Sequence, residues 1–115
     1  MLKVELSRFY VKEGKSETVD EWLRFLNEHM EDTLLTLEDE KMYVESIHRE
    51  ILHGREVLYW YSVQGNGGQK VEDSNHEIDR IHLAYWKECI DKGYEDIKAE
   101  VVMIPNKIRR AMTDE

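Results

Sequence analysis

Hydrophobic and polar residues alternate in four stretches of the chain, and a period of two is typical of half-buried β-strands. The stretches cover residues 2–11, 42–53, 56–64 and 97–104. A short turn signal at Gly54 and Arg55 separates the second stretch from the third, which predicts an antiparallel hairpin. Pro105, the single proline, is expected to end the last strand because it cannot donate a backbone hydrogen bond.

Two further stretches repeat their apolar residues every three or four positions, as amphipathic helices do. They cover about residues 17–37 and 75–92, and each begins near a capping-box sequence. The order βαββαβ predicts an α+β fold of the ferredoxin-like type. Right-handed connections would place both helices on one face of a four-stranded antiparallel sheet. The length of 115 residues predicts a single domain, 1–115.

The sheet face opposite the helices is predicted to be rich in apolar side chains. The residues expected there are Phe9, Tyr59, Tyr61, Val102 and Ile104. An apolar area of this size is unusual on a surface in water. We therefore expect a homodimer in which two such bare faces pack together about a two-fold axis. The alternative is an exposed sheet on which the tyrosine rings lie along the surface.

The charge balance of the chain narrows the range of partners. There are 25 acidic and 16 basic residues, and the formal net charge is −9. This balance argues against nucleic acids and anionic membranes, because both bind an excess of Lys and Arg. No apolar run approaches the ~20 residues of a membrane span, and the first residues lack the continuous apolar segment of a signal peptide. With one Cys and no export signal, a cytoplasmic protein is expected.

Polar residues at inward positions predict a small-molecule pocket between the sheet and the helices. The candidates are Glu45, Arg49, Trp60, His82, Arg8 and Tyr85. A carboxylate and an imidazole beside an aromatic wall suit acid–base chemistry. We expect Glu45 or His82 to move a proton and Arg49 to hold an anionic or polar group. Trp60 would form the wall of the pocket, and Arg8 and Tyr85 would contribute to ligand binding.

The same residues also fit a purely structural interpretation, in which an Arg–Glu pair and a hydrogen-bonded histidine stabilise the core. A metal site is not expected. On a helix, the six residues from His76 to His82 turn the chain through ~600°, so the two rings do not share a face. Cys89 is expected to be buried and inert, and no cofactor is expected.

Two segments of the chain resemble the dimeric α/β-barrel superfamily. They are residues 37–46, which lead into Leu58-Tyr59-Trp60-Tyr61, and residues 78–86. Within that superfamily they are similar to a small bacterial family of uncharacterised proteins. The resemblance implies a ferredoxin-like dimer. Its members include sugar mutarotases, lactone isomerases, cofactor-free monooxygenases, haem-degrading enzymes and proteins without demonstrated activity, so the fold does not fix the function.

Three functions are therefore open. The first is a small homodimer with a ligand pocket and metal-free acid–base chemistry of the isomerase kind. The second is a non-catalytic ligand-binding or structural dimer. The third is a monooxygenase-like enzyme that uses haem or no cofactor. A deep, enclosed pocket would favour ligand use over a structural role.

Overall fold

The computed structural model describes residues 2–113, apart from the side chains of residues 92–94. Its elements are β1 (Lys3–Val11), α1 (Ser16–Glu28), α2 (Met30–Glu40), β2 (Met42–Leu52), β3 (Arg55–Gln64), a 3₁₀ turn η1 (Val71–Asp73), α3 (Glu77–Cys89), β4 (Ile90–Asp96) and α4 (Asn106–Thr113). The strands form one antiparallel sheet in the order β2-β3-β1-β4. The predicted α+β class is therefore confirmed.

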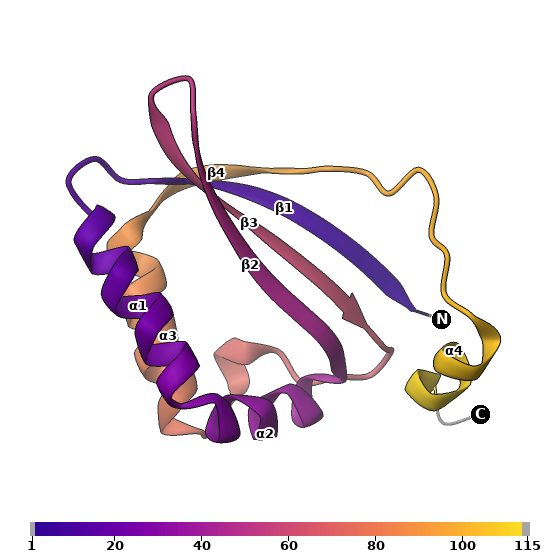
Figure 1. Ribbon diagram of the computed structural model, residues 1–115. Coiled ribbons are helices and arrows are strands. Elements are labelled where there is room, and N and C mark those ends of the chain that lie inside the picture. Colours follow the sequence, from indigo (N-terminus) through magenta and orange to yellow (C-terminus); the bar gives the residue numbers. More distant parts are fainter. Residues whose placement is uncertain (1, 114–115) are drawn as a thin grey trace.

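The helices α1 and α3 pack against each other and cover one face of the sheet, whereas α2 turns away toward the start of β2 (Figure 1). The core lies between this helix pair and the central strands. Trp22 and Val19 of α1 and Leu58 of β3 are fully buried in it. None of the helices in residues 2–113 combines the length and apolar character that a bilayer span requires.

Strand β1 turns a different face to the helices than its apolar pattern suggests. Phe9 pairs with Leu58 and is only 8% exposed, so it belongs to the core and the prediction that it lies on the bare face is wrong. The reason is that β1 carries apolar residues on both faces. Leu6 points outward and Phe9 inward, and alternation alone cannot decide which set meets the helices.

The β2–β3 hairpin forms as predicted, but its turn is His53-Gly54 rather than Gly54-Arg55. Both turn residues have positive φ angles, 51° and 79°, as a two-residue type I′ turn requires. Arg49 therefore pairs with Leu58, and Trp60 pairs with Ile47. The observed register of β2 against β3 differs from the predicted register by two residues. Because side chains alternate between faces with a period of two, each keeps its predicted face of the sheet.

The first predicted helix is two helices that meet at His29. The backbone of His29 leaves the helical region, and its ring nitrogen Nδ1 contacts the carbonyl oxygen of Phe25 at 2.9 Å. Apolar spacing continues from Leu26 through Met30 to Leu34, so the pattern conceals the bend. As a result, Met30 and Leu34 of α2 are 42% and 52% exposed, although they continue the apolar stripe of α1.

The last strand lies earlier in the chain than predicted. Strand β4 follows α3 directly, whereas residues 97–105 form no strand and lead to α4, which the sequence did not predict. Val102 and Ile104 therefore do not lie on the sheet face. The strand β4 is held by polar contacts, Ser7 Oγ to Asp96 Oδ1 at 2.6 Å and Arg8 to Glu95. A charged edge strand lacks the apolar alternation by which a strand is usually recognised.

Candidate functional site

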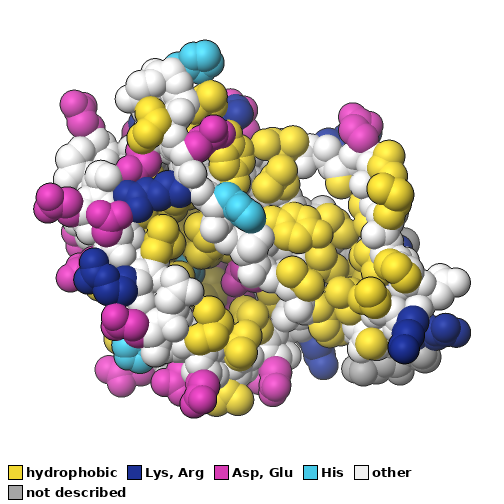
Figure 2. Space-filling model, viewed as in Figure 1, with side chains coloured by type: hydrophobic (Ala, Val, Ile, Leu, Met, Phe, Trp, Pro, Cys, Tyr) yellow, Lys and Arg dark blue, Asp and Glu magenta, His cyan; other side chains and the backbone are white. Residues whose placement is uncertain are grey.

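A cavity of about 770 Å³ lies between the inward face of the sheet and the helices α1, α2 and α3. We call it the interior cavity. Its floor is formed by β1, β2 and β3, and η1 closes one side. Figure 2 shows the hollow between helices and sheet, bordered by hydrophobic side chains and with acidic atoms inside it. Its volume falls in the range of small-molecule pockets.

Glu45 reaches the interior cavity from β2, beside Trp60 of β3. The indole Nε1 of Trp60 donates a hydrogen bond to Glu45 Oε2 at 2.8 Å, which fixes the carboxyl group against the aromatic wall. Burial raises the pKa of Glu45, the nearby charge of Asp79 raises it further, and the Trp60 bond opposes the shift. Glu45 therefore holds its proton more strongly than an exposed glutamate does.

His82 reaches the interior cavity from α3, and its orientation is fixed by α1. Trp22 Nε1 donates a hydrogen bond to His82 Nδ1 at 3.0 Å. A ring nitrogen that accepts a hydrogen bond carries no proton, so neutral His82 carries its proton on Nε2. Burial lowers the pKa of His82, although the charge of Asp79 opposes the shift. The neutral ring is therefore favoured and can donate a hydrogen bond from Nε2.

Two further acidic residues line the interior cavity. Glu40 is the last residue of α2, and Asp79 lies one turn before His82 on α3. Burial raises the pKa of Glu40 to about 7, helped by the charges of Glu45 and Asp79 and opposed by a hydrogen bond from Thr36. Asp79 is 6% exposed, and its buried Oδ2 has no hydrogen-bond partner among the described residues.

These two carboxyl groups are absent from the residues that the sequence singled out. Asp79 lies three positions before His82, a spacing that places both on one face of a helix, so its inward position could have been inferred. Glu40 lies in the acidic run 38–40, which resembles any solvated helix end. Its position depends on the chain reversal at Lys41, which has a left-handed φ of 55°.

Arg49 shares the inward face of β2 with Glu45 but lies outside the interior cavity. Its Nη1 donates to Asp20 Oδ1 at 2.5 Å, and its Nη2 donates to Glu56 Oε1 at 3.0 Å and to the carbonyl oxygen of Ser16 at 2.9 Å. The guanidinium group thus ties the start of α1 to the hairpin. In this position it does not hold a polar group of a ligand in the interior cavity.

Arg8 and Tyr85 also lie outside the interior cavity. Arg8 follows Ser7, which points inward, and therefore points to the opposite face of the sheet, where it pairs with Glu95. Tyr85 packs between α1 and α3, where its ring stacks on Trp22 with centroids 6.3 Å apart. The expected positions of both residues were wrong. For Arg8, the inward and outward positions of β1 are exchanged relative to the prediction. For Tyr85, the apolar stripe of α3 faces α1 as well as the sheet.

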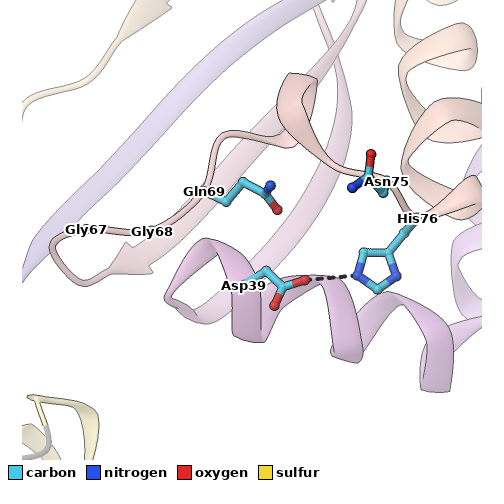
Figure 3. Close-up of a pocket in the computed structure, with 6 residues that line it drawn as sticks. All are labelled: Asp39, Gly67, Gly68, Gln69, Asn75 and His76. Carbon is cyan, nitrogen blue, oxygen red and sulfur yellow. Dashed lines mark hydrogen bonds and ion pairs between the residues drawn. The ribbon is translucent and has the colours of Figure 1, made fainter.

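A second, outer pocket of about 470 Å³ lies between the loop 65–76 and the end of α2 (Figure 3). His76 and Asp39 point toward each other, with His76 Nε2 at hydrogen-bond distance, 2.9 Å, from Asp39 Oδ2. Both side chains are largely exposed, 40% and 53%. The interior cavity brings together Glu40, Glu45 and His82, whose pKa values are shifted by burial, so it is the candidate site.

The loop 65–76 is packed against the end of α2 and is not the loose lid that its glycines suggest. Gln69 N donates to the carbonyl oxygen of Asp39 at 2.8 Å, and Gly65 N donates to that of Lys41 at 2.8 Å. A Cβ atom on Gly68 would lie 1.9 Å from the backbone oxygen of Glu40, so only glycine fits there. The loop therefore helps to fix the position of Glu40.

The described residues offer no cluster of three or more His, Cys, Asp or Glu side chains arranged to hold a metal ion. What the interior cavity offers is five acidic side chains and a neutral imidazole beside an aromatic wall. Glu40, with a pKa of about 7, is close to half ionised at neutral pH. Such a group can both release and accept a proton.

The comparisons with known proteins give a family but no activity. Residues 2–110 match a family model described as a family of unknown function (DUF6176). A search of curated proteins finds no match to the chain. Since the matched region spans almost the whole sequence, the chain belongs to DUF6176, a family of unknown function.

Proposed function

We propose that the protein binds a small organic molecule in the interior cavity and transfers protons to or from it without a metal ion. The observation that carries the proposal is a cluster of carboxyl groups, buried Asp79 with half-buried Glu40 and Glu45, on one largely apolar cavity of about 770 Å³. Burying a carboxylate away from partners is costly. A protein that only needed a stable core would place apolar side chains there.

The three ionisable elements of the site suit different parts of a proton transfer. Glu40, with a pKa of about 7, can act as the base or the acid near neutral pH. Glu45, whose pKa is raised by burial, can deliver a proton from the sheet side. The Nε2–H of His82 can donate a hydrogen bond to an oxygen on which negative charge develops. An isomerase of this kind removes a proton from one position of its substrate and returns a proton at another.

Ligand binding without catalysis is the second candidate. Glu45 and His82 each accept a hydrogen bond from a tryptophan indole, at 2.8 Å and 3.0 Å. These bonds stabilise both side chains in one orientation and would suit a rigid binding site. Exchange of substrate hydrogen for solvent deuterium would separate the two candidates, because a pure binding site promotes none.

A haem-dependent activity is not supported by the residues present. An axial histidine needs an unprotonated ring nitrogen directed at the iron. The bond from Trp22 to His82 Nδ1 leaves the proton on Nε2, the nitrogen that is free to face the interior cavity. The propionates of haem would also meet the carboxyl groups of Glu40, Glu45 and Asp79.

We also propose that two copies form the ferredoxin-like dimer of the α/β-barrel superfamily. The strand order β2-β3-β1-β4 supports this, as does the absence of a described helix packed on the outer sheet face. The segment after β4 supports it too, because Val101 and Met103 are 70% and 85% exposed. Light scattering at tens of micromolar should report twice the chain mass. A monomer would contradict the dimer and leave the cavity unaffected.

Fragment screening by NMR tests the ligand-binding proposal. Small aromatic fragments should shift the indole N–H signal of Trp60 and the signals of residues around His82. These shifts should saturate as more fragment is added. Leu37→Trp, on the cavity wall, should weaken these shifts because the larger ring occupies part of the space that a fragment would take. Leu35→Trp, two positions away, 54% exposed and outside the cavity, should preserve them. Equal behaviour of the two variants would contradict the proposal.

A further inference from the structure

We infer that the ligand of the interior cavity is an organic cation, a protonated amine attached to an apolar group. The inference rests on the proposed function and adds the chemical class of the ligand. It replaces the expectation from the sequence that Arg49 holds an anionic or polar group. The evidence comes from the charges, the unsatisfied oxygen and the aromatic wall of the cavity.

The charges that line the cavity have one sign. The acidic lining residues are Glu5, Glu40, Glu45, Glu72 and Asp79. Among the described lining residues none is Lys or Arg. Glu5 forms an ion pair with Lys3 at 3.4 Å, whereas the other four have no such pair within the described part of the chain. The potential inside the cavity therefore attracts cations and repels carboxylates and phosphates.

Asp79 provides the specific contact. Its side chain lines the cavity and is 6% exposed, and no hydrogen-bond donor of the described residues reaches its Oδ2. A buried carboxylate oxygen without a donor is unfavourable. An ammonium group in the cavity would supply the opposite charge, and a rotation of the carboxyl group that turns Oδ2 toward the cavity would give that oxygen a donor. A neutral hydroxyl group could supply the donor but not the opposite charge, and a carboxylate ligand could supply neither.

The aromatic wall suits the rest of such a ligand. Trp60 and Trp86 line the same cavity with their ring centroids 5.2 Å apart and their planes at 68°. Phe9 packs edge-on against Trp86 at 4.6 Å. The faces of these rings attract a nearby cation and bury an apolar body. A primary amine on a short aromatic or aliphatic group matches the carboxylates and this wall together.

Binding of a cation should release protons. Glu40 is faced by Glu45 from β2, Glu72 from η1 and Asp79 from α3, and these charges add to burial in raising its pKa to about 7. A positive ligand favours the ionised carboxyl groups and lowers that pKa. Affinity should therefore increase as the pH rises from 6 to 8, while the amine itself stays protonated.

Calorimetry with three probes of matched shape tests the inference. The probes are 2-phenylethylammonium, the neutral 2-phenylethanol and the anion phenylacetate. The ammonium should bind about tenfold or more tightly than the alcohol, and phenylacetate should bind least. Asp79→Asn should reduce the preference for the ammonium to about twofold. Asp32→Asn, which removes an exposed carboxylate of α2 outside the cavity, should leave the preference unchanged. NMR spectra should show that both variants are folded.

The outcomes separate the inference from the proposed function. If the alcohol or phenylacetate binds in the cavity as tightly as the ammonium, the cation preference is wrong and the binding site stands. If the ammonium preference persists in Asp79→Asn, the assignment to Asp79 is wrong. If no fragment of any charge binds in the cavity, the proposed function itself is contradicted.

Discussion

Replacing Glu40 by glutamine should stabilise the protein at high pH and have little effect at low pH. The pKa of Glu40 rises from 4.5 to about 7 on folding because the group is buried near other carboxyl groups. Between these two values the folded state binds more protons than the unfolded state, so stability falls as the pH rises. The loss is nearly complete at pH 8, above the pKa of the folded state. Glutamine keeps the shape of the side chain and removes this dependence.

The size of the effect follows from the shift. A difference of 2.5 between the two pKa values corresponds to at most about 3 kcal/mol of unfolding free energy. Glu40 is only partly buried, and solvent screens its interactions with Glu45 and Asp79. We therefore expect about 1–2 kcal/mol at pH 8. For a domain of this length this raises the melting temperature by roughly 4–8 °C.

Thermal melts of Glu40→Gln and the parent protein at pH 5 and pH 8 measure the effect. Glu38→Gln is the matched control, because Glu38 is an exposed residue of the same helix. The variant should melt higher than the parent at pH 8, and the difference should fall to about a quarter of that size at pH 5. A difference of the same size at both pH values would refute the electrostatic reasoning. So would an equal gain in Glu38→Gln.

Three further outcomes are expected. Arg49→Ala should lower the unfolding free energy by about 1–3 kcal/mol in urea denaturation, because two carboxylates lose their partner, while fragment binding stays within about twofold. Gly68→Ala should also cost about 1–3 kcal/mol, because its Cβ meets backbone at 1.9 Å, whereas the exposed Asn66→Ala should be nearly neutral. Nitrogen NMR should find the proton of neutral His82 on Nε2 and its pKa below 6.5, and Trp22→Phe should raise that pKa. A proton on Nδ1 would contradict the Trp22–His82 bond.

The sequence predicts the elements whose apolar period is strong and whose ends are marked. Strand β1, the β2–β3 hairpin and α3 lie close to their expected ranges. Strand β4 was missed because seven residues of an edge strand, Ile90–Asp96, are mostly polar and are held by backbone pairing with β1. The bend at His29 was missed because the apolar spacing runs through it.

The candidate site could be predicted in part, where its residues lie on elements with a strong apolar period. The alternation of side chains along the strands and the spacing of residues along α3 bring Glu45, Trp60 and His82 to one cavity. These three were singled out from the sequence. Arg8 was misplaced because both faces of β1 are apolar. Glu40 could not be found at all, because its inward position depends on the packing of the loop 65–76 against the end of α2.

The central claim is that the interior cavity receives a small molecule, and a crystal structure with 2-phenylethylammonium tests it most directly. We predict electron density for the ligand between the sheet and α3, with its ring beside Trp60 and its nitrogen within hydrogen-bond distance of the Asp79 carboxyl group. A cavity closed by its own side chains, or a ligand bound only elsewhere on the protein, would contradict the claim.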